Sequence, residues 1–239
     1  MKVAATDRHS TFRANQHNRV QARLSLVLAS LGFVFGFARP ALAGPKQAIT
    51  IPVLVYNYAK VPPTILATAE REAFRILGAA GVRVLWMDCL EKFPTIDSKE
   101  LCQSGGAPQT PGLRLVSGHI SSMHEDREFG FAAIPVLATV NYEHIAGWYG
   151  RNGAPDALQA MLGCAIAHEL GHLLLRDPGH STIGIMQPQF GQEQMRQALT
   201  GRLRFTTEQA KLIRERALAQ QRTDERPEQE FLDQKQDFY

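Results

Sequence analysis

The chain is poor in cysteine and has no internal repeat. Its 239 residues include only 3 cysteines, while 44% are hydrophobic and 21% are charged. These proportions exclude a disulfide-dense scaffold, a collagen-like chain and an intrinsically disordered one. We therefore expect an ordinary globular protein with one domain and one core.

Long apolar runs are also scarce, and one lies near the start of the chain. Residues 24–38 are uncharged, follow a basic stretch that ends at Arg23 and precede Ala41-Leu42-Ala43, in which two small residues flank one other residue. This order is typical of an export signal. As a helix, such a run rises only about 22 Å, short of the roughly 30 Å of a bilayer core. We expect residues 1–43 to be a signal peptide cleaved after Ala43, which predicts a secreted or periplasmic protein without a stable membrane span. An uncleaved leader that anchors the protein is the alternative.

Without this leader, the chain has no excess of basic residues. The whole chain has 26 basic and 23 acidic residues and a formal charge of +3. Residues 1–43 hold six of the basic residues and one of the acidic ones, which leaves 20 against 22. No basic stripe interleaved with aromatic residues remains downstream, so nucleic-acid binding has no support in the sequence.

The order of the predicted elements favours an α+β fold. Apolar and β-branched patterns predict strands over residues 48–58, 82–87, 113–117, 130–134 and 136–145. Helical periodicity predicts helices over residues 62–77, 155–175 and 206–218. We expect one domain over residues 44–218. Residues 219–239 are rich in charge and glutamine and poor in apolar anchors, which predicts a disordered tail.

The three cysteines allow one local disulfide. Cys89 and Cys102 flank a polar segment that contains a proline and is expected to be a loop, and an exported protein meets an oxidising environment. We expect these two to be bonded and Cys164 to be a buried thiol.

The helix over residues 155–175 contains the motif that carries chemistry. In His168-Glu169-Leu170-Gly171-His172, two histidines four residues apart project from one face of the helix, where both can bind one metal ion. Glu169 lies beside them and can take a proton from a water on the metal. Because this helix is apolar all round, two neighbouring buried imidazoles need a partner.

A catalytic zinc ion takes three protein ligands and keeps one open position. The turn residues Arg176-Asp177-Pro178-Gly179 predict a chain reversal directly after the helix. His180 follows this reversal, and we expect it to be the third ligand.

These residues resemble the zinc-binding stretch of the metzincin metallopeptidases. The likeness runs from His168 through His180 to Met186, about 20 residues in all. It implies a twisted five-stranded sheet, a backing helix, an active-site helix and a helical C-terminal part. It also implies a structural methionine turn at Met186 beneath one catalytic zinc ion.

The spacing departs from the family at two points. The family has glycine three residues after the second histidine, where this chain has Leu175, and His180 comes two residues later than the family's third histidine. Asp177 is the local alternative as third ligand, and Glu193 or Glu208 would make the site similar to that of gluzincins.

The other candidate residues have ordinary structural interpretations. Cys164, one turn before His168, is expected to be a small core residue. For the pair Trp148-Tyr149 ordinary packing is expected, and lining of a substrate cleft is the alternative. No partner pattern surrounds the three histidines His119, His124 and His144.

The resemblance implies a zinc metalloendopeptidase with Glu169 as general base. Its partner would be a peptide or protein substrate that lies extended along an edge strand such as residues 130–135. A noncatalytic zinc-stabilised binding domain and a zinc amidohydrolase acting on nonprotein amides are the alternatives. The sequence does not predict an oligomeric state.

Overall fold

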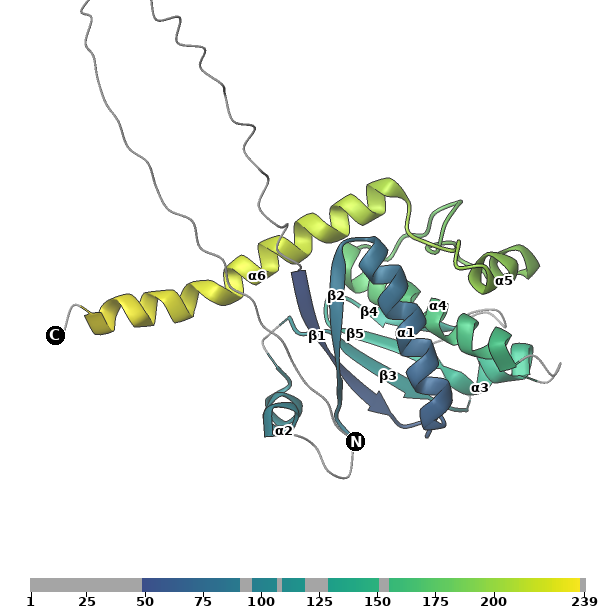
Figure 1. The fold of residues 1–239 in the computed structure, drawn as a ribbon, viewed down its shortest axis with the longest axis horizontal. Helices are drawn as coiled ribbons and strands as arrows, with labels where there is room; N and C mark the ends of the chain where they lie inside the picture. Colours follow the sequence, from purple (N-terminus) through teal and green to yellow (C-terminus); the bar gives the residue numbers. More distant parts are fainter. Residues whose placement is uncertain (1–48, 91–95, 107–108, 119–128, 151–154, 237–239) are drawn as a thin grey trace, which may run out of the picture. The chain divides into compact units, whose positions relative to one another are not determined.

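A five-stranded sheet with helices packed on it forms the described part of the chain (Figure 1). The computed structural model describes residues 49–90, 96–106, 109–118, 129–150 and 155–236, so the expected leader lies outside them. The strand order is β2-β1-β3-β5-β4, and β4 runs antiparallel to β5 while the other pairs are parallel. The strands are β1 (Ile49–Asn57), β2 (Val82–Asp88), β3 (Gly112–Val116), β4 (Gly130–Ala133) and β5 (Leu137–Asn141). The predicted α+β class and strand number are confirmed.

Pro52 lies inside β1 without disturbing the sheet. β2 pairs with β1 from Ile49 onward, whereas β3 pairs with it only from Leu54. The Leu54 N–H points to the β3 side, where it donates to the carbonyl of Pro111. Because backbone groups alternate sides along a strand, the Pro52 nitrogen points to that same side at a position that β3 does not reach.

Two helices form a layer against the sheet. α1 (Pro63–Ala79) and α4 (Pro155–Leu175) pack on each other, and both lie close to the predicted bounds. By length and composition alone α4 could cross a membrane, but 83% of its apolar window is buried inside the protein. It is the central core helix, as its uniform apolar character predicts.

The segment after Pro135 differs from its prediction. A strand is expected over residues 136–145, but β5 ends at Asn141 and a short helix, α3 (Tyr142–Ile145), follows it. The Asn141 side chain accepts the N–H of His144 and so caps the first turn of α3. A π-helix, η1 (Ala146–Gly150), then leads toward α4.

The C-terminal part is more helical than predicted. The helix α5 (Gln192–Leu199) was not predicted from the sequence, and α6 (Thr207–Gln236) continues well beyond residue 218. The prediction of a disordered tail over 219–239 is therefore wrong as far as Gln236. Few apolar residues argue against burial, but glutamine, glutamate and arginine extend a helix that has already begun.

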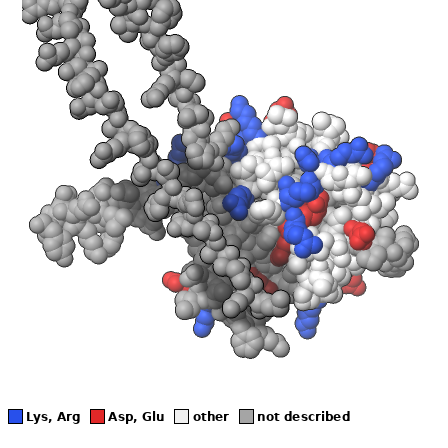
Figure 2. All heavy atoms as spheres, in the orientation of Figure 1, with Lys and Arg blue, Asp and Glu red and all other residues white. Residues whose placement is uncertain are grey.

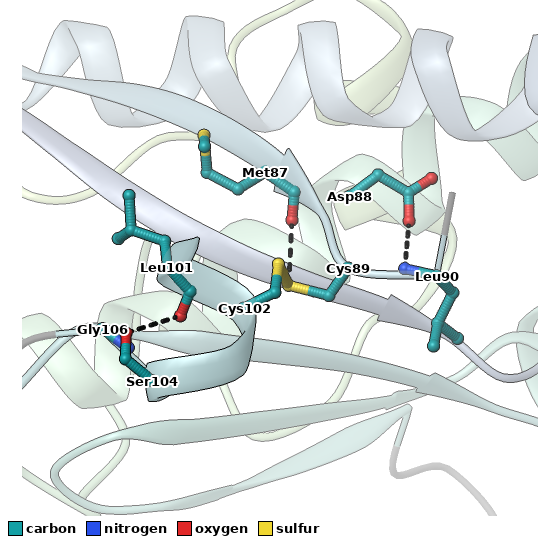
Figure 3. The surroundings of a disulfide bond; sticks show 8 residues. All are labelled: Met87, Asp88, Cys89, Leu90, Leu101, Cys102, Ser104 and Gly106. Atoms are coloured by element: carbon teal, nitrogen blue, oxygen red, sulfur yellow. Dashed lines mark hydrogen bonds between the residues drawn. A yellow bond between two sulfur atoms is a disulfide. The ribbon is translucent and has the colours of Figure 1, made fainter. Parts of the chain in front are cut away.

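The predicted disulfide joins Cys89 to Cys102 (Figure 3). Cys89 follows β2, and Cys102 lies in α2 (Ile96–Ser104), a helix within the segment expected to be a loop. The two Cα atoms are 5.4 Å apart, and the cysteines are 13 positions apart in sequence. A cross-link that closes a loop of this size stabilises a domain by about 3 kcal/mol. Cys164 is free and buried, as expected.

The surface carries charges of both signs. On the face shown in Figure 2, lysine and arginine side chains lie beside aspartate and glutamate side chains. Among the described residues of this face, neither sign forms a continuous region.

Candidate metal centre

α4 brings His168 and His172 together in the core. One helical turn separates them, so their imidazoles share a face, with ring centroids 4.8 Å apart. Both residues are buried, and their Nε2 atoms are 3.1 Å apart. Two nitrogen ligands on one tetrahedral zinc ion, each about 2.0–2.1 Å from the metal, lie about 3.3 Å apart. The pair is therefore spaced as two ligands of one ion.

Main-chain carbonyls orient both rings. His168 Nδ1 donates to the carbonyl oxygen of Ile185 at 2.7 Å, and His172 Nδ1 donates to that of Asp177, also at 2.7 Å. A neutral imidazole that carries its proton on Nδ1 has a free lone pair on Nε2. Burial, with a smaller contribution from His172, lowers the pKa of His168 to about 3, and burial also lowers the pKa of His172. Two neutral lone pairs thus face each other, an arrangement that a cation stabilises.

His180 completes a cluster of three imidazoles. Its ring centroid lies 4.9 Å from that of His172 and 5.3 Å from that of His168. One nitrogen of each ring lies within 4.8 Å of the others, and these three residues are the group of metal-ligating side chains found in the described part of the chain. The alternatives Asp177, Glu193 and Glu208 do not join this group.

A turn held by Asp177 accounts for the late position of His180. α4 ends where Arg176 takes a left-handed conformation with φ of 46°, and the Asp177 N–H donates to the carbonyl of His172. The Asp177 carboxylate then accepts the N–H of Gly179 at 2.8 Å. Such an Asx turn reverses the chain without a glycine at position 175. The two extra residues therefore lie in the turn that returns His180 to the side of His168 and His172.

Met186 lies directly against the helix between the two histidines. It is buried, and a Cβ atom added at Gly171 would come within 2.8 Å of its sulfur. The Met186 carbonyl accepts the N–H of Ser181 at 2.8 Å, which closes the segment after His180. Met186 therefore packs against α4 between the two histidines, and the absence of a side chain at Gly171 permits this close approach.

The side chain of Glu169, a residue of α4, lies against the edge strand β4. Its side chain is 5% exposed. A Cβ atom on Gly130, the first residue of β4, would lie 2.9 Å from both Cγ and Oε1 of Glu169. The absence of a side chain at Gly130 leaves room for this carboxylate beside β4. No sequence pattern predicts this role of Gly130, because its contact with Glu169 arises only in the folded chain.

Aromatic rings lie against His168 and near the histidine cluster. Phe190 meets the ring of His168 edge to face at 5.5 Å, and no sequence pattern predicts this contact. His144 is half-buried against Phe129, with centroids 5.8 Å apart. His119 and His124 lie outside the described residues.

The chain has a structural likeness to a known protein but no match in sequence. No protein-family model and no curated protein matches the chain. Among solved structures, the chain is similar to an archaemetzincin from Methanopyrus kandleri, at 16% identity and a TM-score of 0.44. The match covers 72% of this chain and 98% of the other.

If the turn at Asp177 positions His180, its loss should weaken zinc binding. We expect Asp177→Ala to lower zinc affinity about 10- to 100-fold, because His180 loses the turn that returns it to the cluster. Asp177→Asn keeps an acceptor oxygen for the Gly179 N–H and is expected to bind zinc as the unchanged protein does. Competition with a chromophoric chelator measures both constants. Equal losses in the two variants would show that the carboxylate charge, rather than the turn, is what the site needs.

Proposed function

We propose that this protein is an exported, zinc-dependent metallopeptidase that hydrolyses peptide bonds. His168, His172 and His180 would hold one zinc ion, and Glu169 would be the general base. The observation that carries the proposal is the convergence of three imidazoles beside a buried carboxylate. Three protein ligands with one open position are typical of catalytic zinc, whereas structural zinc sites have four protein ligands.

The donor set suits zinc. Neutral imidazole is a preferred ligand of this ion, and the Nδ1–H bonds of His168 and His172 hold two of the rings in the ligating tautomer. When bound, zinc supplies Lewis acidity that polarises a substrate carbonyl and makes water more acidic.

The role of Glu169 follows from its position. Its carboxylate accepts a proton from water as the water oxygen adds to the carbonyl carbon of the substrate. The carbon–nitrogen bond then breaks, and Glu169 returns the proton to the departing amine nitrogen. The products are a carboxylic acid and an amine, and Glu169 ends the cycle as a carboxylate.

The edge strand β4 offers a place for the substrate. β4 pairs with β5 on one side and ends the strand order on the other. A peptide in extended form can add to such an edge by main-chain hydrogen bonds. Since Gly130 of β4 lies against Glu169, a peptide on this edge would pass its amides close to the carboxylate.

One assay separates this proposal from its alternatives. We expect the full chain to bind one zinc ion and to cleave members of a diverse peptide mixture. Glu169→Gln is expected to retain zinc and to lose cleavage by about 100- to 10,000-fold, because it removes the general base. Glu208→Gln is the matched control and should change neither zinc content nor cleavage. Zinc binding without cleavage by any of these proteins would favour a binding domain, and cleavage of nonprotein amides alone would favour an amidohydrolase.

Export has its own test. The run of residues 24–38 and the small residues up to Ala43 support a signal peptide that is removed. Intact-mass measurement of the exported protein should give a chain that begins at Gly44. A mass that retains residues 1–43 would instead indicate an anchored protein.

A further inference from the structure

A cavity lies at the C-terminal end of α4, apart from the histidine cluster. Its volume is about 180 Å³. α4 contributes Leu173 and Leu174 to its wall, and none of the three clustered histidines is part of the lining. Successive residues of a helix are turned by about 100°, so Leu174 lies on the opposite side of α4 from His172. The cavity is therefore separate from the proposed metal site.

A gap in the sheet creates this cavity. β1 begins at Ile49, whereas β3 pairs with it only from Leu54 onward. Ile51 and Pro52 line the cavity, in the stretch of β1 that β3 leaves uncovered. Because Pro52 has no N–H, its position leaves no unpaired amide donor in the wall.

Two helices close the gap. Leu101 of α2 lines the cavity next to Cys102, whose disulfide to Cys89 ties this wall to the end of β2 (Figure 3). α6 packs against both β1 and α4, and it contributes Arg216 and Ala217. A cross-link and helix packing thus give the cavity a defined shape.

Apolar side chains form most of the wall. They come from isoleucine, alanine, three prolines and three leucines. An apolar cavity of about 150 Å³ is large enough to bind benzene. This cavity can therefore hold a phenyl ring or a branched alkyl group of similar size.

The charged residues of the described lining are two arginines, Arg176 and Arg216. In the described part of the chain, neither forms an ion pair with a carboxylate. The acidic residues next to them in sequence have other partners. The Asp177 carboxylate accepts a main-chain N–H, and Glu215 lies 3.9 Å from Lys211. Two positive charges therefore lie at an apolar cavity without a described carboxylate to balance them, an arrangement that attracts an anion.

The backbone at Arg176 is a second, independent sign of a functional site. Its φ of 46° is left-handed, at the end of a helix, where glycine is the usual residue. The Arg176 guanidinium donates to Gln109 and, at 3.1 Å, to Gln220, and both glutamines belong to the lining. These neutral amide oxygens hold the guanidinium in the wall without cancelling its charge. Unfavoured backbone conformations such as this one cluster at functional sites.

We propose that this cavity binds a small organic carboxylate that carries one compact apolar group. A guanidinium can donate two parallel hydrogen bonds to a carboxylate. The apolar group would lie between the leucines of α4 and the uncovered stretch of β1, out of contact with water. An ammonium group beside the carboxylate would be repelled by the arginines, so free amino acids are expected to bind less tightly. The proposal does not depend on the proposed peptidase function.

A titration followed by ligand NMR tests the proposal, with 3-phenylpropionate as the probe. The full chain should bind it with a Kd of about 1 mM or below. The neutral 3-phenylpropanamide, which has the same shape, and acetate, which lacks the apolar group, should each bind about tenfold more weakly. Equal binding of the acid and the amide would overturn the proposal. Inorganic phosphate that binds as tightly as the probe would also overturn it, because the apolar wall would then contribute nothing.

A second arm separates the cavity from the metal site, since zinc also binds carboxylates. The Kd of 3-phenylpropionate should be the same for the zinc-loaded chain and for the chain after zinc is removed by a chelator. His180→Ala should leave this Kd unchanged as well. Binding that disappears with the metal would place the probe at the histidine cluster and contradict the proposal.

Variants in the wall identify the site. Arg216→Gln changes an exposed residue of α6, and it should weaken binding of 3-phenylpropionate about tenfold while leaving that of the amide unchanged. Arg214→Gln, two positions earlier in α6 and outside the lining, is the matched control and should bind the probe normally. Leu101→Trp should fill the cavity and abolish binding of both compounds, whereas Leu212→Trp, also outside the lining, should not. Equal affinities of Arg216→Gln and Arg214→Gln for the probe would contradict the proposal.

Discussion

The candidate metal centre depends on two hydrogen bonds from histidine Nδ1 atoms to main-chain carbonyls. Both carbonyls lie in the segment that follows α4, one at Asp177 and one at Ile185. Each bond fixes a ring and its tautomer, so the helix alone does not make the site. The site forms only when the segment after α4 folds back over the helix and places the carbonyls of Asp177 and Ile185 next to the two histidines.

Several contacts hold that returning path in place. Asp177 turns the chain, Met186 packs against Gly171, and the Ile185 N–H donates to the carbonyl of Arg204 at 2.9 Å. The same segment then places Phe190 against His168. One stretch after the helix therefore supplies the third histidine of the cluster, the carbonyls that orient the other two and the aromatic ring against His168. A carboxylate and two imidazoles can lie in an apolar helix because this stretch and β4 enclose them.

The sequence predicts the parts of this site that depend on local spacing. The histidine pair and Glu169 follow from helical geometry, the α+β class follows from element order, and the disulfide follows from a short loop. The parts of the site that depend on contacts between distant segments cannot be predicted from the sequence. Gly130 contacts Glu169 and Phe190 contacts His168 only because the fold brings separate segments together. Asn141, by contrast, carries a local capping signal that marks the end of β5, and the long α6 reflects helix propensity that needs no burial.

X-ray absorption at the zinc edge tests the central claim most directly. For the full chain loaded with one zinc ion, we expect three imidazole nitrogens at about 2.0–2.1 Å and one further light ligand. His180→Ala should show one imidazole fewer. A first shell in which a carboxylate replaces the third imidazole, or a spectrum that His180→Ala leaves unchanged, would contradict the account.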